Sequence, residues 1–152
     1  MDGVRVYWDG FNLYYRNGTQ IHAPHDFVLG LPQIKIDGEL WAGSGKFEQL
    51  MSILSSGLTD WSRILFVVFD IVASKQSYHL RLEALSKIVW PKQVMVLESH
   101  LCQGIQHLES YLSSILSKGG EGIILRDPIS PYIAGRSSTL LKLKVYILFI
   151  KH

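Results

Sequence analysis

The last third of the chain holds the pattern that most restricts its fold. Two stretches typical of short strands, residues 122–126 and 140–144, stand on either side of a loop punctuated by proline and glycine. Side chains alternate between the two faces of a strand, so Lys142 and Lys144 are expected on one face. The same alternation directs the leucines of that strand, Leu141 included, into the core. The segment therefore predicts two strands joined by a loop, with two lysines side by side.

An acidic residue, Glu121, comes directly before the first of these strands. It follows a helical pattern over residues 106–118, which the double glycine at 119–120 is expected to end. Carboxylate oxygens are ligands that Mg²⁺ prefers, and lysine ammonium groups are compact positive charges that suit phosphate. One acid and two lysines delivered by two strands therefore suit an anionic ligand that also carries a divalent metal.

The rest of the chain mixes further strand and helix patterns. Residues 64–72 form a continuous apolar run of strand length, which is typical of a strand in the middle of a sheet. Residues 2–18 predict a β-meander with two-residue turns at Asp9-Gly10 and Asn17-Gly18. Strands are also expected over residues 34–41 and 94–98. Amphipathic helices are expected over residues 46–54 and 77–89.

Specific side chains of these elements are expected in the core. The apolar stripes predicted to be buried are Phe47, Leu50, Met51 and Leu54 in the first helix and Leu82, Leu85 and Val89 in the second. In the strand over residues 34–41, Asp37 and Glu39 share one face and Ile36 and Leu40 take the other. Asp70 interrupts an apolar run, and a buried carboxylate needs partners.

Bulk composition sets wide bounds. A chain of 152 residues forms one domain or a fragment of a larger protein, and its 47% hydrophobic content is ample for a packed core. The net charge of +2 is too small to predict nucleic-acid binding by itself. The single cysteine, Cys102, excludes an internal disulfide and is expected to be a buried structural thiol in a reducing, intracellular setting. No apolar run reaches transmembrane length, so no membrane association is expected.

Five short motifs in order resemble those of the ATP-dependent DNA ligases, over residues 2–144. They are Asp2-Gly-Val-Arg5, Asp37-Gly-Glu-Leu-Trp41, Phe69-Asp70, Glu121-Gly-Ile-Ile-Leu-Arg126 and Leu141-Lys-Leu-Lys144. The stretch Tyr132-Ile-Ala-Gly-Arg-Ser137 is similar to the linker between the last two motifs in small, minimal members of the family. The resemblance implies an α+β fold. Antiparallel sheets flanked by helices would form the nucleotidyltransferase domain of DNA ligases and mRNA capping enzymes, which is ATP-grasp-like.

The resemblance also implies a role for each matching residue. Glu121 would hold Mg²⁺, and Lys142 and Lys144 would act on the phosphates of ATP. Glu39 would contact the ribose or orient water. The other implied positions are Arg5 and Arg16 for nucleotide binding, Phe69 for stacking on adenine, and Asp2, Asp37 and Asp70 in support. For Arg16 a solvated turn position is an equal alternative, and for Phe69 core packing competes, because Phe66 lies in the same run.

One residue of the family pattern is missing. The first motif carries a lysine two residues before its aspartate, and counted from Asp2 that lysine would precede Met1. Two explanations stay open: a truncated or fragmentary sequence, or a pseudoenzyme that binds nucleotide without reacting. The expected organisation is a partial adenylation domain over residues 1–144 and a divergent apolar tail over 145–152. The oligonucleotide-binding barrel (OB-fold) domain that follows in the family is not in the sequence.

The implied function is ATP-dependent sealing of nicks in DNA repair, replication and recombination. In this chemistry a lysine amine attacks the α-phosphate of ATP, AMP moves to the DNA 5′-phosphate, and the 3′-hydroxyl displaces AMP. The expected partners are ATP or AMP and nicked double-stranded DNA, bound by a monomer located in the nucleus, mitochondrion or cytoplasm. The alternatives are a non-catalytic nucleotide- or DNA-binding module and an RNA ligase-like nucleotidyltransferase. All versions expect Glu39, Glu121, Lys142 and Lys144 to converge on one crevice walled by Phe69.

Overall fold

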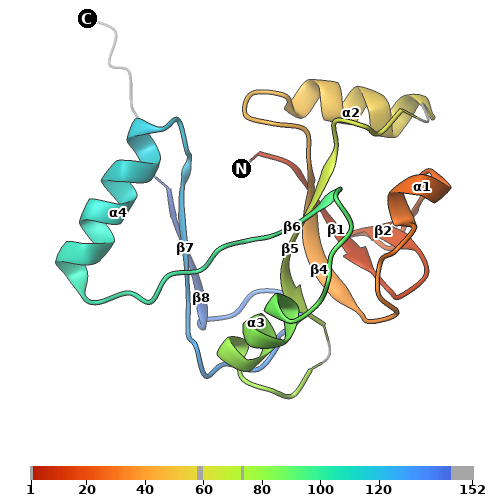
Figure 1. Cartoon of the computed structure of the whole chain (residues 1–152). Helices are drawn as coiled ribbons and strands as arrows, with labels where there is room; N and C mark the ends of the chain where they lie inside the picture. Colours follow the sequence, from red (N-terminus) through yellow and green to blue (C-terminus); the bar gives the residue numbers. More distant parts are fainter. Residues whose placement is uncertain (1, 58–59, 73, 145–152) are drawn as a thin grey trace, which may run out of the picture. The chain divides into compact units, whose positions relative to one another are not determined.

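The computed structural model describes residues 2–57, 60–72 and 74–144 of the chain, and these residues divide into two units (Figure 1). Unit 1 holds the described residues up to Glu98 together with the segment Pro128–Ile133. Unit 2 holds Ser99–Asp127 and the described residues from Ala134 onward. The segment Pro128–Ile133 thus belongs to unit 1, although it lies within the loop between the last two strands of unit 2. The apolar tail predicted over residues 145–152 lies outside the described residues.

Unit 1 is built on a sheet that has, among the described residues, six strands in the order β3-β2-β1-β4-β5-β6. The strands are β1 (Val4–Trp8), β2 (Leu13–Tyr15), β3 (Gln20–Ile21), β4 (Ile36–Trp41), β5 (Leu65–Ile71) and β6 (Val94–Val96). Neighbouring strands are antiparallel, except that β6 runs parallel to β5. The apolar run expected in the middle of a sheet forms β5, an inner strand between β4 and the edge strand β6. Its parallel partner requires a crossover, and α3 (Tyr78–Ser86) supplies it.

Both turns of the opening meander are longer than the two residues predicted. Trp8 pairs with Leu13, so residues 9–12 join β1 to β2, and Asp9 Oδ1 accepts hydrogen bonds from the backbone N–H groups of Phe11 and Asn12 at 2.7 Å each. Residues 16–19 join β2 to β3, and the Tyr15 N–H donates to the Thr19 carbonyl at 2.8 Å across this turn. The prediction was wrong because Asp9 bonds the backbone of the next residues and so favours a wider loop.

The core of unit 1 lies between one face of the sheet and the helices α1 (His25–Val28), α2 (Phe47–Ser56) and α3. The helices contribute Phe27, Leu50 and Leu85 to it. The sheet contributes Val6, Trp8, Leu13, Ile21, Ile36, Leu40, Phe66 and Val68. Burial of this apolar surface is the main driving force for folding of the unit.

Three residues expected in the helical stripes are instead exposed. In α2, Leu50 is fully buried, whereas Phe47 and Met51 are 37% and 38% exposed, because Ile53 and Leu54 complete the inward face. Val89 is 93% exposed because α3 ends at Ser86, before the predicted boundary. The chain then turns, and the indole N–H of Trp90 donates to the Leu85 carbonyl at 3.0 Å, which satisfies a carbonyl at the helix end.

Unit 2 consists of α4 (Ile105–Ser117) and the strands β7 (Gly122–Arg126) and β8 (Leu140–Lys144), which pair antiparallel (Figure 1). Both predicted strands are confirmed at their predicted bounds. The double glycine ends α4 as expected: the N–H groups of Gly119 and Gly120 donate to the carbonyls of Leu116 and Ile115, and Gly119 has a φ of 79°. A left-handed residue at this position is favourable for glycine and costly for other residues.

Two burial predictions in unit 2 were wrong. Leu141 is 57% exposed, because one helix beside a two-stranded sheet does not cover its whole face, and α4 itself has no fully buried residue. Cys102 is exposed in the segment before α4, so its apolar sequence neighbours do not enclose the thiol.

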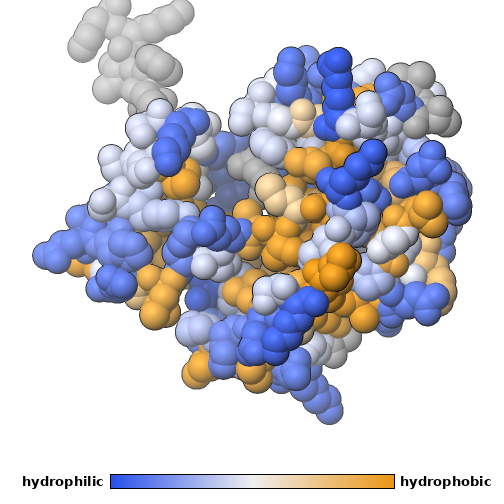
Figure 2. Space-filling model, in the orientation of Figure 1, coloured by the Kyte–Doolittle hydropathy of each residue, from blue (hydrophilic) through white to orange (hydrophobic). Residues whose placement is uncertain are grey.

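Exposed hydrophobic side chains occur on both units, and the face drawn in Figure 2 shows them among hydrophilic ones. The largest exposed fractions are those of Val89 and Ile129 in unit 1 and Leu101 in unit 2. Scattered residues of this kind are normal at protein surfaces. Within the described part of the chain, no helix combines the length and the apolar content needed to cross a membrane.

Candidate functional site

A charged pair lies on the face of the unit 1 sheet that points away from the core. Arg5 of β1 stands opposite Glu39 of β4, and its guanidinium reaches the carboxylate of Asp37, two residues along the same strand. Nε donates to Oδ1 at 3.0 Å and Nη2 donates to Oδ2 at 2.5 Å. The Asp37 side chain is 5% exposed and that of Arg5 is 48% exposed. The hydrogen bond with Asp37 raises the pKa of Arg5, so this cation is permanent.

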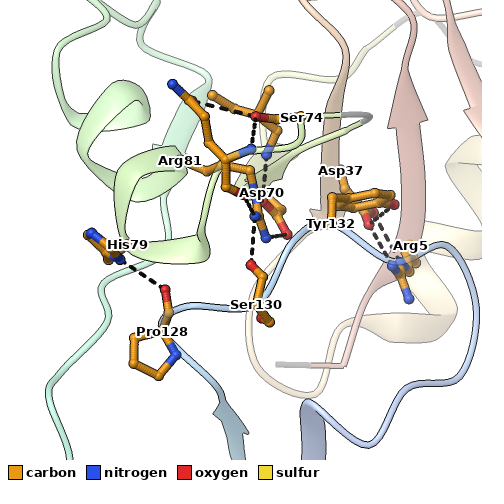
Figure 3. Close-up of polar contacts among 11 residues, drawn as sticks. Arg5, Asp37, Asp70, Ser74, His79, Arg81, Pro128, Ser130 and Tyr132 are labelled. Atoms are coloured by element: carbon orange, nitrogen blue, oxygen red, sulfur yellow. Dashed lines mark hydrogen bonds and ion pairs between the residues drawn. The ribbon is translucent and has the colours of Figure 1, made fainter.

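Tyr132 completes the surroundings of Asp37. Its hydroxyl donates to Asp37 Oδ2 at 2.9 Å (Figure 3). Burial raises the pKa of Tyr132 to about 12, and the negative charge of Asp37 acts in the same direction. The hydroxyl is therefore a donor at every physiological pH. Asp37 accepts three hydrogen bonds, two from Arg5 and one from Tyr132, which compensates for its burial.

A β-bulge places Phe69 beside this pair. The register between β4 and β5 shifts at Asp37 and Gly38: Gly38 faces Val68 and Asp37 faces Asp70, which leaves Phe69 as the extra residue. Bulges re-aim side chains, and the ring of Phe69 lies 5.7 Å from Cζ of Arg5, within the range of a cation–π contact. Phe66 is buried in the core and Phe69 is half-buried outside it. The structure thus separates the two phenylalanines, and stacking of Phe69 on adenine stays a prediction.

Asp70 is fully buried, and its carboxylate faces the guanidinium of Arg81 from α3 (Figure 3). Nε and Nη2 of Arg81 donate to the two carboxylate oxygens at 2.6 and 3.1 Å. Nη1 donates to the carbonyls of Gln76 at 2.5 Å and Ser130 at 3.0 Å. The expectation that a buried Asp70 has partners is confirmed, and its supporting role in a reaction stays a prediction.

Glu39 lies against the backbone of the first motif. A Cβ built on Gly3 would stand 2.7 Å from Glu39 Oε1 and would overlap the Leu40 carbonyl oxygen, so only glycine fits between these groups. The Glu39 side chain is half-buried, and Asp2, which directly precedes Gly3, is exposed. This explains in part why glycine follows the aspartate of the motif: β4 approaches the chain too closely there for any side chain.

In unit 2, the pairing of β7 and β8 organises the predicted phosphate-binding residues. Lys142 pairs with Ile124 and Lys144 with Gly122, so both lysines lie on one face, as predicted. Lys144 Nζ donates to Glu121 Oε2 at 2.6 Å. This hydrogen bond is the largest cause that lowers the pKa of Glu121, and the charge of Lys142 acts in the same direction. Lys142 is exposed, so its ammonium group is open to solvent.

The donor set of unit 2 fits Mg²⁺ only with help from a ligand. Glu121 is a 43% exposed carboxylate, and among the described residues no three histidine, cysteine, aspartate or glutamate side chains are grouped to hold a metal. Mg²⁺ typically takes one or two carboxylates together with water and substrate phosphates. Glu121, with two lysines nearby that could hold substrate phosphates, is consistent with Mg²⁺ bound in this way.

The structure brings some predicted residues together and leaves others apart. Arg5, Asp37 and Phe69 form one cluster in unit 1, and Glu121, Lys142 and Lys144 form another in unit 2. Arg16 is exposed in the loop between β2 and β3, and within the described residues it has no polar contact with the first cluster. Convergence of the two clusters on one crevice stays a prediction.

Two residues that hold carboxylates of unit 1 had no role assigned from the sequence: Arg81, which bonds to Asp70, and Tyr132, whose hydroxyl bonds to Asp37. A signal for Arg81 existed, because Asp70 in an apolar run needed a cation, and Arg81 lies four residues before the buried Leu85 on one helix face. No local pattern pointed to Tyr132, because its partner Asp37 is 95 positions away.

Comparisons with known proteins account for this arrangement of motifs. The family model described as ATP-dependent DNA ligase domain matches residues 1–144. The chain belongs to this family. A DNA ligase of Haemophilus influenzae is 32% identical to this ligase-family domain over 148 residues, which is 95% of the chain and 55% of the relative. The chain therefore spans about half the length of that curated relative.

Solved structures agree with the family assignment. A Lig E DNA ligase structure matches with a TM-score of 0.88 and 35% identity, over 95% of this chain and 59% of the other. A Chlorella virus DNA ligase–adenylate matches with a TM-score of 0.80 and 25% identity, over 95% of this chain and 58% of the other. These matches confirm the predicted α+β nucleotidyltransferase fold.

Proposed function

We propose that this ligase-family domain carries out the nucleotide-transfer part of DNA nick sealing, with ATP as the nucleotide and nicked double-stranded DNA as the acceptor. The observation that carries the proposal is the Arg5 guanidinium, a half-exposed cation held by Asp37 beside the Phe69 ring. The relatives support it, because they are DNA ligases and one was solved as its adenylate. They extend well beyond the matched region, so activity of the whole protein is part of the proposal.

Each cluster would contribute a distinct interaction. An aromatic ring offers a flat apolar surface for a nucleobase, and a guanidinium offers directed donors to phosphate oxygens. Lys142 and Lys144 would face the negative charge that develops on phosphate oxygens during transfer. Glu121 would hold Mg²⁺, which when bound neutralises phosphate charge. Lys144 bonded to Glu121 keeps that carboxylate ionised, because its pKa is lowered.

The proposal is tested with the family's nucleophilic lysine in place. The chain with a lysine directly before Met1 is incubated with α-labelled ATP and Mg²⁺, beside a matched version that carries arginine there. Covalent label on the lysine version alone is the expected result. No label on a folded lysine version that binds ATP would overturn the catalytic proposal and favour the non-catalytic nucleotide-binding alternative.

The acceptor is tested in the same preparation. Labelled protein is offered nicked DNA or a nicked RNA duplex of the same sequence, and transfer of AMP to the 5′-phosphate is followed. Transfer to DNA is expected. Transfer to RNA alone would replace DNA by RNA as the proposed substrate.

A further inference from the structure

We propose that Tyr132 is a positioning residue: through Asp37 it holds the free edge of the Arg5 guanidinium in place for a phosphate group of the ligand. Arg81 in turn would hold Tyr132 in place. The inference concerns the site of the proposed function and rests on it for the identity of the ligand.

The first step concerns the donors of Arg5 that Asp37 does not use. A guanidinium has five N–H groups in a fixed planar fork. Asp37 takes one at Nε and one at Nη2. The remaining N–H groups belong to a side chain that is 48% exposed. Because the fork is rigid, the orientation of the Asp37 carboxylate determines where these remaining donors point.

The second step concerns Asp37. Its side chain is 5% exposed, so water has little access to replace a lost partner. Arg5 holds both oxygens from one side, and Tyr132 holds Oδ2 with its hydroxyl at 2.9 Å. Without that hydroxyl, the Arg5 side chain would be the one remaining hydrogen-bond donor shown for the carboxylate among the described residues. The pair could then rotate together, and the free edge of Arg5 would lose its fixed direction.

The third step concerns how Tyr132 reaches Asp37. It lies in the segment Pro128–Ile133, which is fastened to unit 1 at two backbone carbonyls (Figure 3). The Ser130 carbonyl accepts from Arg81 Nη1 at 3.0 Å, and the Pro128 carbonyl accepts from the His79 backbone N–H at 3.0 Å. Arg81 is itself held by Asp70 and is fully buried. The fastening therefore ends two residues before Tyr132 and restricts where its ring can lie.

These contacts form one continuous set, from α3 through the segment Pro128–Ile133 to β4 and β1. Asp70 and Arg81 are bonded to each other, and Arg81 reaches the segment at the Ser130 carbonyl. Their effect on ligand binding would pass through Tyr132 and Asp37, which is why we class Tyr132 as a positioning residue.

The test compares Tyr132→Phe with Tyr15→Phe in the full 152-residue chain. Tyr15 is a matched control because it lies on β2, packs against the core, and within the described residues its hydroxyl makes no hydrogen bond. The first measurement is the hydrogen-exchange rate of the Arg5 Nε–H by NMR, without ligand. The second is calorimetric binding of AMP and of adenosine, whose affinity ratio isolates the contribution of the phosphate.

In Tyr132→Phe we expect faster exchange of the Arg5 Nε–H and a ratio that falls roughly threefold to tenfold, the range expected for one hydrogen bond. Adenosine binding should be unchanged, and Tyr15→Phe should match the wild type in both measurements. General loosening of unit 1 would instead weaken adenosine and AMP alike, and that result would overturn the proposal.

Unchanged Nε–H exchange in Tyr132→Phe would also overturn it, as would faster exchange with an unchanged ratio. If the wild-type chain binds neither AMP nor adenosine, the proposed function fails. The exchange measurement alone then decides whether Tyr132 holds Arg5 in place.

Discussion

Replacement of Arg81 by methionine should destabilise unit 1 strongly. Arg81 and Asp70 are both fully buried, and four hydrogen bonds of the guanidinium would be lost: two to Asp70, one to the Gln76 carbonyl and one to the Ser130 carbonyl. Methionine fills a similar volume but leaves Asp70 as a buried charge without its cation. Removal of one partner from a buried ion pair costs about 3–5 kcal/mol. A typical domain has about 5–15 kcal/mol of stability in total, so this loss is large.

The measurement is urea-induced unfolding, monitored by tryptophan fluorescence. All four tryptophans lie in unit 1, at positions 8, 41, 61 and 90, so the signal reports on that unit. The control is Arg63→Met, because Arg63 is an exposed arginine of the same unit and should change the unfolding free energy by no more than about 0.5 kcal/mol.

A double variant, Asp70→Asn with Arg81→Met, separates the buried charge from simple loss of packing. Since an asparagine side chain carries no charge, the double variant should recover at least about 1 kcal/mol relative to Arg81→Met alone. The reasoning would be refuted if Arg81→Met lost less than about 1 kcal/mol, or if the double variant were no more stable than the single one.

Three further results are expected. Lys144→Met should raise the pKa of Glu121 in an NMR titration, because the hydrogen bond that lowers this pKa is lost. The wild-type pair is partly exposed, so it should add only a few tenths of a kcal/mol to the free energy of unfolding. This contribution is present above the ordinary glutamate pKa and is lost as the pH falls. An unchanged Glu121 pKa would contradict the pairing. Gly3→Ala should cost about 1–3 kcal/mol in urea unfolding, because its Cβ meets Glu39 and the neighbouring backbone; wild-type stability would show that this contact is absent. Ultraviolet titration should show one tyrosine fewer ionising near pH 12 in Tyr132→Phe, and wild-type stability should decline between about pH 10 and 12, since the folded-state pKa is the higher one; equal titrations would argue against the buried hydroxyl.

Much of the local structure followed from the sequence alone. The strands at residues 122–126 and 140–144, the stop of α4 at the double glycine and the inner strand β5 were all predicted. The motif order also identified the family that the comparisons then established. These features depend on side-chain periodicity, turn residues and spacing, which act between residues a few positions apart.

Other local predictions were wrong where burial was at issue. Phe47, Met51, Val89, Leu141 and Cys102 were all expected to be buried, yet all are exposed. An apolar pattern shows which side chains are able to enter a core. Whether they do so depends on what packs opposite, and in unit 2 a single helix beside two strands covers little.

Only the tertiary structure decided how the site is assembled. The bulge that turns Phe69 toward Arg5 depends on the register between β4 and β5, and Arg81 becomes a partner of Asp70 only when α3 packs against β5. The bond from Tyr132 to Asp37 joins residues 95 positions apart. Buried charges and hydroxyls must find partners wherever the folded chain supplies them, because water is excluded there. The spacing of residues in the sequence does not specify these partners, so they are identified only from the three-dimensional structure.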